Sequence, residues 1–410
     1  MLRQFIERLE SGESTPESLL EVCLRRIAEA DPAIRAWVEV CPQPSLNEGL
    51  LRGIPFGVKD IIETRGMATE YGSPLYAGRK GERDASVVRE LRGGGAVPMG
   101  KTHTTAFASF DPAPTRNPRL DGHTPGGSSS GSAAAVAAGM VPFALGTQTL
   151  GSVLRPASFC GICGFKPTFG LVSMDGVLPF APSLDTLGFL TESAADMECL
   201  WSRGFGGQSD VPLRRLAYFR VPVEDPMAHA ISDAVDRLRA CGVPVLDCEL
   251  PSGWERTAKA ASLINDYEGA RTHAARYAEF GERIGTRLAD LVRRGLAIPD
   301  EEYLDAMQQV EQTRRELSQI LWEYPAIVSP AAMGPAPAGL SSTGDPSINA
   351  PWTALGVPAI SVPLPVTVAP LGMQVNAAWG RDDALVSVAA DVERLLGGAC
   401  SGVLASISLP

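Results

Sequence analysis

The feature that most constrains this chain is a glycine- and serine-rich loop that leads directly into a helix-forming run. The loop spans residues 125–132, PGGSSSGS, and the run AAAVAA follows at 133–138. Such a loop leaves backbone N–H groups free at the start of the helix. A second loop, residues 146–152 (GTQTLGS), follows the apolar segment 141–145, which is predicted to be a buried strand. A serine ending such a loop can be held rigidly beside N–H groups directed into one pocket, as an oxyanion hole requires.

Three other interpretations fit the first loop less well. A phosphate-binding P-loop needs Lys and then Ser or Thr after the last glycine, whereas Ser132 and Ala133 stand there. Residues 127–131 match the pattern GxSxG of a nucleophile elbow, but an elbow follows a buried strand, and the preceding segment 116–123 is polar and contains a proline. A flexible linker is not expected between two segments patterned for a core.

The charge and the distribution of apolar residues argue against a nucleic-acid-binding, secreted or membrane-spanning protein. With 36 Lys and Arg against 47 Asp and Glu, the formal net charge is −11, which argues against a nucleic-acid partner because phosphate binding needs a basic face. The N-terminus lacks the apolar stretch of a signal peptide, and no apolar run is long enough to span a membrane, so we expect a cytoplasmic protein. Eight cysteines are too sparse for a disulfide scaffold, and Cys160 and Cys163 are expected to be reduced structural residues.

Hydrophobic periodicity predicts helices and strands along most of the chain. The second of two N-terminal helices is expected to begin after Thr15 as the N-cap, with Pro16 in its first turn, and a helix from Ser86 is expected to end at glycines 93–95. Further helices are expected at 225–240, 252–275, 283–295 and 300–323. Strands are expected at 36–40, 96–99, 216–221, 243–250, 326–330 and 359–362.

Together with the upstream segment GIPFGVKD at 53–60, the two serine loops resemble the amidase signature family. The resemblance extends from about residue 51 to residue 192 and again through SVP at 361–363. It implies an α/β fold with a large central mixed β-sheet covered by helices on both faces. We expect one amidase domain over 1–410, made of N-terminal helices (1–50), a catalytic core (51–192), a helical elaboration over the site (195–325) and a C-terminal return to the sheet (326–410).

The resemblance also implies a Ser–cis-Ser–Lys triad. Ser152 matches the nucleophile, Ser128 the bridging serine after a cis peptide bond, and Lys59 the base. A serine hydroxyl is a weak nucleophile until a neighbour takes its proton, and an amine takes a proton only while neutral. Lys59 is therefore expected to lie where desolvation or nearby positive charge lowers its pKa. The backbone N–H groups expected to form the oxyanion hole are those of Thr149, Leu150, Gly151 and Ser152.

Three positions depart from the common family pattern and resemble the bacterial malonamidase branch. Gln148 stands where the family commonly has Asp, Leu150 replaces a glycine, and Arg155 follows the nucleophile by three residues instead of two. In that branch the arginine binds a substrate carboxylate, which an arginine can hold by two parallel hydrogen bonds. A structural salt bridge is the alternative role for Arg155. Substrate contacts are predicted for Arg155, Ser129 and Gln148, with Asp266, Tyr267 and Glu268 as further candidates.

The predicted function is hydrolysis of a small amide to a carboxylate and ammonia through an acyl-serine, on a carboxylate-bearing substrate such as malonamate. This chemistry requires no metal or organic cofactor. The alternatives are an amidase for neutral or ureide amides, a transamidating subunit that acts on a tRNA-linked substrate, and a non-catalytic amidase-like binding protein. The expected partners are a small-molecule amide and, as in the malonamidases, a second copy of the chain, with no nucleic acid and no membrane.

Overall fold

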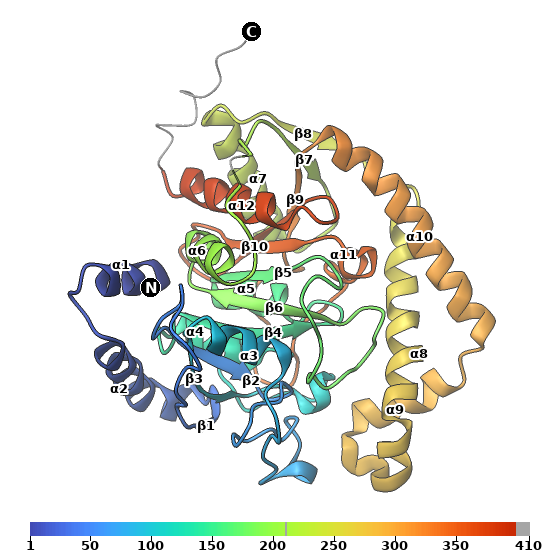
Figure 1. Ribbon diagram of the computed structural model, residues 1–410. Helices are drawn as coiled ribbons and strands as arrows, with labels where there is room; N and C mark the ends of the chain where they lie inside the picture. Colours follow the sequence, from blue (N-terminus) through green and yellow to red (C-terminus); the bar gives the residue numbers. More distant parts are fainter. Residues whose placement is uncertain (210, 399–410) are drawn as a thin grey trace.

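The computed structural model describes residues 1–209 and 211–398, which contain one mixed sheet of eleven strands (Figure 1). The strand order is β1-β3-β2-β4-β6-β5-β10-β11-β9-β7-β8. Strands β3, β2 and β4 are parallel, as are β9, β7 and β8, and antiparallel pairs join the two groups. The predicted α/β fold with a large mixed sheet is confirmed. The strands are β1 Trp37–Val40, β2 Pro55–Lys59, β3 Val97–Thr102, β4 Phe143–Gln148, β5 Cys163–Lys166, β6 Thr186–Thr191, β7 Leu216–Phe219, β8 Val245–Cys248, β9 Ala326–Pro330, β10 Ala359–Pro363 and β11 Gly372–Asn376.

The helices in the N-terminal third of the chain begin and end where the capping residues predict. Helix α1 spans Leu2–Glu10, and α2 spans Pro16–Ile34 after Thr15, whose side chain accepts a hydrogen bond from the backbone N–H of Ser18. Helix α3 (Ser86–Gly93) ends at the glycine run, and Gly95, with φ of +98°, turns the chain towards β3. The sequence signals for these ends are local, and the structure follows them.

The two serine loops lie on either side of β4. The first leads into α4 (Ser130–Ala137), which precedes β4, and the second follows β4 and leads into α5 (Leu154–Cys160). Periodicity predicts neither α5 nor the strands β5 and β6 that follow it. The residues of both strands are buried throughout, so their sequences carry no alternation of apolar and polar side chains.

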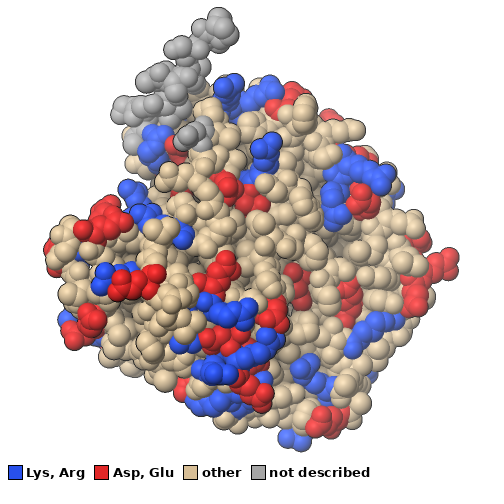
Figure 2. All heavy atoms as spheres, in the orientation of Figure 1, with Lys and Arg blue, Asp and Glu red and all other residues tan. Residues whose placement is uncertain are grey.

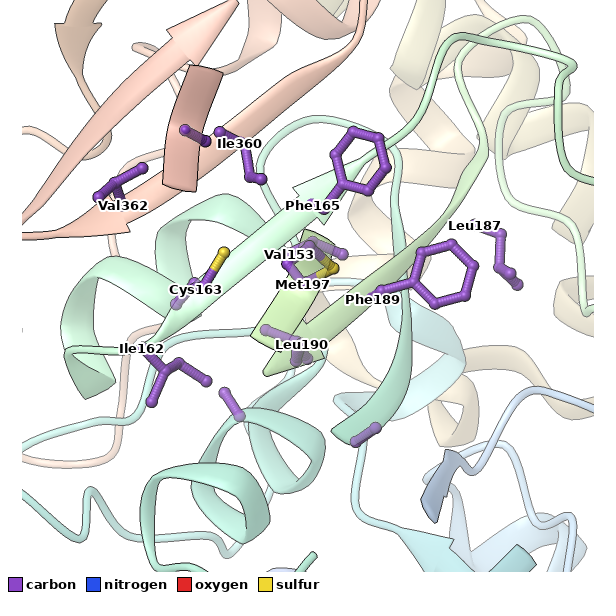
Figure 3. Packing of buried hydrophobic residues seen from close by; sticks show 14 of the residues in the cluster. Val153, Ile162, Cys163, Phe165, Leu187, Phe189, Leu190, Met197, Ile360 and Val362 are labelled. Atoms are coloured by element: carbon purple, nitrogen blue, oxygen red, sulfur yellow. The ribbon is translucent and has the colours of Figure 1, made fainter. Parts of the chain in front are cut away.

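The apolar core reaches directly to the second serine loop. Val153, the residue after the predicted nucleophile, is fully buried and lies in the cluster that Figure 3 shows with Phe165 and Phe189. A Cβ atom added to Gly188 on β6 would come within 2.7 Å of a Val153 methyl group. The space around Val153 is therefore full, and packing fixes the backbone that carries Ser152.

The strands of the segment 195–325 belong to the main sheet. Strand β7 pairs in parallel with both β8 and β9, so the strands expected at 216–221 and 243–250 extend the sheet. Three helices form an outer layer beside the sheet, coloured yellow to orange in Figure 1: α8 Trp254–Phe280, α9 Thr286–Leu296 and α10 Asp300–Glu323. Trp352 joins this layer to the sheet, because its ring lies 4.8 Å from that of Trp254 and 5.8 Å from that of Phe219.

The remaining helices are α6 Ala194–Gly204, α7 Asp225–Ala240, α11 Ala350–Leu355 and α12 Asp382–Leu396. Helix α12 packs on α6 and α7 and contacts β10. Cys160 and Cys163 are buried and free, as the sequence predicts. Within residues 1–209 and 211–398, no helix is both long and apolar enough to cross a membrane. Residues 399–410 of the predicted C-terminal segment lie outside the described part of the chain.

Candidate active site

Lys59 is the last residue of β2, and its side chain is fully buried. Its Nζ lies 2.7 Å from Ser128 Oγ, 3.1 Å from Ser129 Oγ and 2.8 Å from Thr147 Oγ1. Burial holds the pKa of Lys59 well below its usual value, although the charge of Asp185 acts in the opposite direction. A neutral amine has two hydrogens and one lone pair, so it can donate to Thr147 and Ser129 and accept the proton of Ser128.

Ser128 is presented by the first serine loop. The peptide bond between Gly127 and Ser128 is cis, as the resemblance implies, and Gly126 before it adopts φ of +82°. The carbonyl oxygen of Ser128 accepts hydrogen bonds from the Thr104 hydroxyl at 3.1 Å and from the backbone N–H of Thr105 at 3.3 Å. These contacts hold the backbone while the Ser128 hydroxyl lies against Lys59.

Ser152 closes the second loop, two residues before α5 begins. Its carbonyl oxygen accepts the backbone N–H of Ser129 at 3.3 Å, which ties the two serine loops together. In the described part of the chain, the backbone N–H groups of residues 149–152 donate no hydrogen bond to protein. Four consecutive free donors beside a serine hydroxyl match the arrangement that stabilises an oxyanion.

A small cavity of about 20 Å³ lies between Ser128, Ser152 and the N–H groups of residues 149–152. The residues in its wall come from both serine loops, segment 108–110, α5, the segment before β6, α8 and the segment before α11: Ala108, Ser109, Phe110, Ser128, Thr149, Leu150, Gly151, Ser152, Arg155, Phe180, Asn265, Thr343 and Pro346. Ser128 and Ser152 thus share one space with the four free N–H groups. A cavity of this size holds about one water molecule, so the space beside the two serines is narrow.

Arg155 is anchored by the backbone and keeps one nitrogen free. Its Nε donates to the Thr343 carbonyl at 2.7 Å, and its Nη2 donates to the Gly127 carbonyl at 2.8 Å. Its Nη1 is buried and has no partner among the described residues. Burial lowers the pKa of Arg155 to about 10, so the group stays charged near neutral pH. The salt bridge considered from the sequence is absent from the described residues, and Nη1 is the nitrogen available to a ligand.

Two of the predicted substrate contacts have other partners in the structure. The side-chain carbonyl of Gln148 accepts the backbone N–H groups of Val153 and Leu154, and its amide donates to Thr353, so Gln148 holds the start of α5. Ser129 lies beside Lys59, where its hydroxyl contacts Nζ and the Thr147 backbone. Neither residue lies in the cavity wall, and we replace both predictions with supporting roles.

Some residues that close the cavity lie outside the serine loops and carry no signal in the sequence. Asn265 on α8 lies in the wall, whereas its predicted neighbours have partners elsewhere: Asp266 pairs with Arg294, Tyr267 stacks on Tyr303, and Glu268 accepts from Ser183. Helical periodicity marks Asn265 only as a buried position, and no motif singles it out. Its place in the site follows from the packing of α8 beside the sheet.

Comparison with known proteins shows a family that spans the site. The sequence profile described as Amidase matches residues 18–206. A glutamyl-tRNA(Gln) amidotransferase subunit of Symbiobacterium thermophilum is 31% identical, over 92% of this chain and 93% of the relative. The corresponding subunit of Halothermothrix orenii is 29% identical, over 96% of this chain and 97% of the relative.

Solved structures that resemble this chain include proteins with the same descriptions as the sequence relatives and the family profile. A protein described as an amidase superposes with a TM-score of 0.87 at 29% identity, over 97% of this chain and 100% of that chain. The corresponding glutamyl-tRNA(Gln) amidotransferase subunit of Thermotoga maritima superposes with a TM-score of 0.81 at 29% identity, over 92% of this chain and 91% of that chain. The similarity therefore covers the sheet, the outer helices and both serine loops.

Proposed function

The chain belongs to the amidase family, and we propose that it releases ammonia from a small amide that carries a carboxylate, through an acyl-Ser152 intermediate. Enzymes of this family act on C–N amide bonds. The observation that carries the substrate proposal is the free Nη1 of Arg155, which is buried and belongs to a residue in the wall of the Ser152 cavity. A buried cationic donor without a partner is costly unless an anion or acceptor completes it.

The proposed reaction begins with attack of Ser152 Oγ on the amide carbonyl carbon. The Ser152 proton passes to Ser128, and the Ser128 proton passes to the neutral Lys59 amine, whose Nζ lies 2.7 Å from Ser128 Oγ. The developing oxyanion takes hydrogen bonds from the free N–H groups of residues 149–152. Lys59 then returns the proton through Ser128 to the leaving nitrogen, and ammonia departs. Water, activated by the same relay, hydrolyses the acyl-serine to the carboxylate.

The size and charge of the site support a small anionic substrate. The cavity beside the two serines is narrow, at about 20 Å³, which favours an amide of a few atoms. Arg155 is held at two of its nitrogens, so its position is fixed before a ligand binds, which reduces the entropy cost of binding. Malonamate, whose carboxylate is one methylene from its amide carbonyl, is a small amide of this class, and Arg155 and Ser152 lie in the wall of the same cavity.

The relatives favour a second candidate function, transamidation of a tRNA-linked substrate, more strongly than they favour hydrolysis of malonamate. Their name describes amide transfer to glutamyl-tRNA(Gln), and the similarity covers more than 90% of each chain. In that case this chain would release ammonia from an amide donor and pass it to partner subunits. The predicted absence of a nucleic-acid partner conflicts with that name.

The face of the molecule shown in Figure 2 carries Lys and Arg interspersed with Asp and Glu. A malonamidase-like identity, a homodimer and a cytoplasmic location remain predictions from the sequence.

Ammonia release by the purified chain, assayed without partners, separates the two candidates. Malonamate, glutamine and neutral propionamide are assayed at equal concentrations, and the variant Ser152→Ala is the inactive control. We expect turnover of a carboxylated amide that exceeds turnover of propionamide and disappears in Ser152→Ala. Turnover that appears only after partner subunits and tRNA are added would favour transamidation and contradict an independent hydrolase.

A further inference from the structure

We propose that Asp185 is a positioning residue of this site, because its carboxylate joins the loop of free N–H groups to the facing wall of the cavity. The inference rests on the proposed acyl-serine chemistry and adds a residue that neither the triad nor the substrate contacts include. Asp185 lies in the turn directly before β6 and is 8% exposed. No motif in the sequence analysis singles it out.

The carboxylate of Asp185 is held entirely by donors from two walls of the cavity. Its Oδ1 accepts the hydroxyl of Thr149 at 2.7 Å, and its Oδ2 accepts the backbone N–H groups of Phe180 at 2.7 Å and Ala181 at 3.1 Å. Thr149 carries the first of the four free N–H groups, and Phe180 lies in the cavity wall. One side chain therefore fixes both the oxyanion loop and the wall that faces it.

An aspartate is suited to this position because it accepts several hydrogen bonds and donates none. An asparagine offers a single acceptor oxygen to three donors and leaves at least one of them without a partner. Within the described residues, no Lys or Arg forms an ion pair with Asp185, and three hydrogen bonds compensate its buried charge. Loss of the charge should therefore loosen both walls together.

The charge of Asp185 also acts on the base. The charged groups that face it are Lys59 on β2 and Glu268 on α8. Burial, with a smaller contribution from Glu268, raises the pKa of Asp185 to about 6, so the group is an anion above that pH. An anion stabilises protonated Lys59 and so raises the pKa of Lys59 against the effect of burial. Asp185 therefore shifts to higher pH the range in which Lys59 becomes neutral.

The rate of Ser152 labelling by a small alkyl fluorophosphonate, measured from pH 5.5 to 10, tests both effects without a known substrate. For the wild type, the rate should rise with pH to a plateau as Lys59 loses its proton. Asp185→Asn should lower the plateau about tenfold or more, because the oxyanion donors lose their orientation, and should move the midpoint to lower pH. Thr149→Val should lower the plateau with an unmoved midpoint, and Thr149→Ser should restore the plateau.

Several outcomes would overturn the proposal. An Asp185→Asn protein with the wild-type plateau, or with a lower plateau and an unmoved midpoint, contradicts the inference. If Asp185→Asn does not fold, the variants Thr149→Val and Thr149→Ser test the proposal instead. Equal plateau rates for Thr149→Val and wild type would exclude a positioning role for Asp185. Failure of the proposed function looks different, since wild-type protein would then take no label on Ser152 at any pH.

Discussion

Lys59 Nζ and Ser128 Oγ lie 2.7 Å apart, although 69 residues separate them in the chain. The contact exists because β2 and β4 are parallel neighbours, and the first serine loop returns to the end of β2 before α4 begins. The fully buried amine has hydroxyl partners, and among residues 1–209 and 211–398 no carboxylate forms a hydrogen bond with it.

Replacement of Lys59 by Met should abolish turnover and should also change the pH dependence of stability. Because the folded-state pKa of Lys59 is lowered, the unfolded chain binds more protons between the folded and unfolded pKa values. In that range, the free energy of unfolding of the wild type rises with pH, by up to about 1.4 kcal/mol per pH unit for one group. The difference in unfolding free energy between wild type and Lys59→Met should therefore shift in favour of wild type as the pH rises towards about 10.

Denaturant unfolding at several pH values measures that difference. Lys101 and Lys166 are also buried, with pKa values lowered to about 8 and about 7, but both remain in the variant, so their effects cancel. A difference between wild type and variant that is constant with pH would show that Lys59 has an ordinary pKa in the folded protein. That result would exclude a neutral Lys59 amine as the base at neutral pH.

Replacement of Arg155 by Gln should impair carboxylated amides more than neutral ones. The change removes the charged donor Nη1 but also weakens the contacts with the Gly127 and Thr343 carbonyls, so kcat should fall for every substrate. Loss of a hydrogen bond to a charged group costs about 1.5–3 kcal/mol, or roughly tenfold to 150-fold. The ratio of kcat/KM for malonamate to that for propionamide should fall by that factor, and an unchanged ratio would exclude carboxylate binding by Arg155.

Replacement of Gln148 by Leu should destabilise the protein without changing substrate preference. The variant leaves the backbone N–H groups of Val153 and Leu154 without their buried acceptor, at a cost of about 1–3 kcal/mol. Denaturant unfolding measures this loss. The malonamate-to-propionamide ratio of kcat/KM should stay at the wild-type value, and a selective loss of malonamate activity would restore Gln148 as a substrate contact.

Replacement of Asn265 by Ala should widen the cavity from the α8 side. Asn265 is 3% exposed and lies in the cavity wall. We expect kcat/KM for a longer amide such as glutaramate to rise relative to malonamate. Asp266→Ala is the matched control, because its side chain points to Arg294 and lies outside the wall. Equal effects of the two substitutions would show that α8 does not set the size of the substrate.

The sequence predicts the parts of this site that local chemistry marks. Ser128 and Ser152 stand in loops whose glycines and flanking core segments are visible in the sequence, and Lys59 stands in a motif upstream of them. Helices with clear caps, such as α2 after Thr15, are predicted for the same reason. In each case the signal lies within a few residues of the feature.

The residues that prediction missed depend on contacts between distant segments. Asp185 meets Thr149 across 36 residues, and Asn265 reaches the cavity because α8 packs beside the sheet. Gln148 looks like a site residue by its position, but the turn into α5 draws its side chain onto backbone N–H groups. Strands β5 and β6 are buried on both faces, so their sequences lack the alternation that reveals a strand.

Peptide mass spectrometry after fluorophosphonate treatment tests whether Lys59 activates Ser152 as the nucleophile. Wild type, Lys59→Ala and Ser152→Ala are treated in parallel, and their folding is checked by circular dichroism. We expect a single adduct on Ser152 in the wild type and none in either folded variant. An adduct on another residue, or labelling of Ser152 in Lys59→Ala at the wild-type rate, would contradict a nucleophile activated by Lys59 through Ser128.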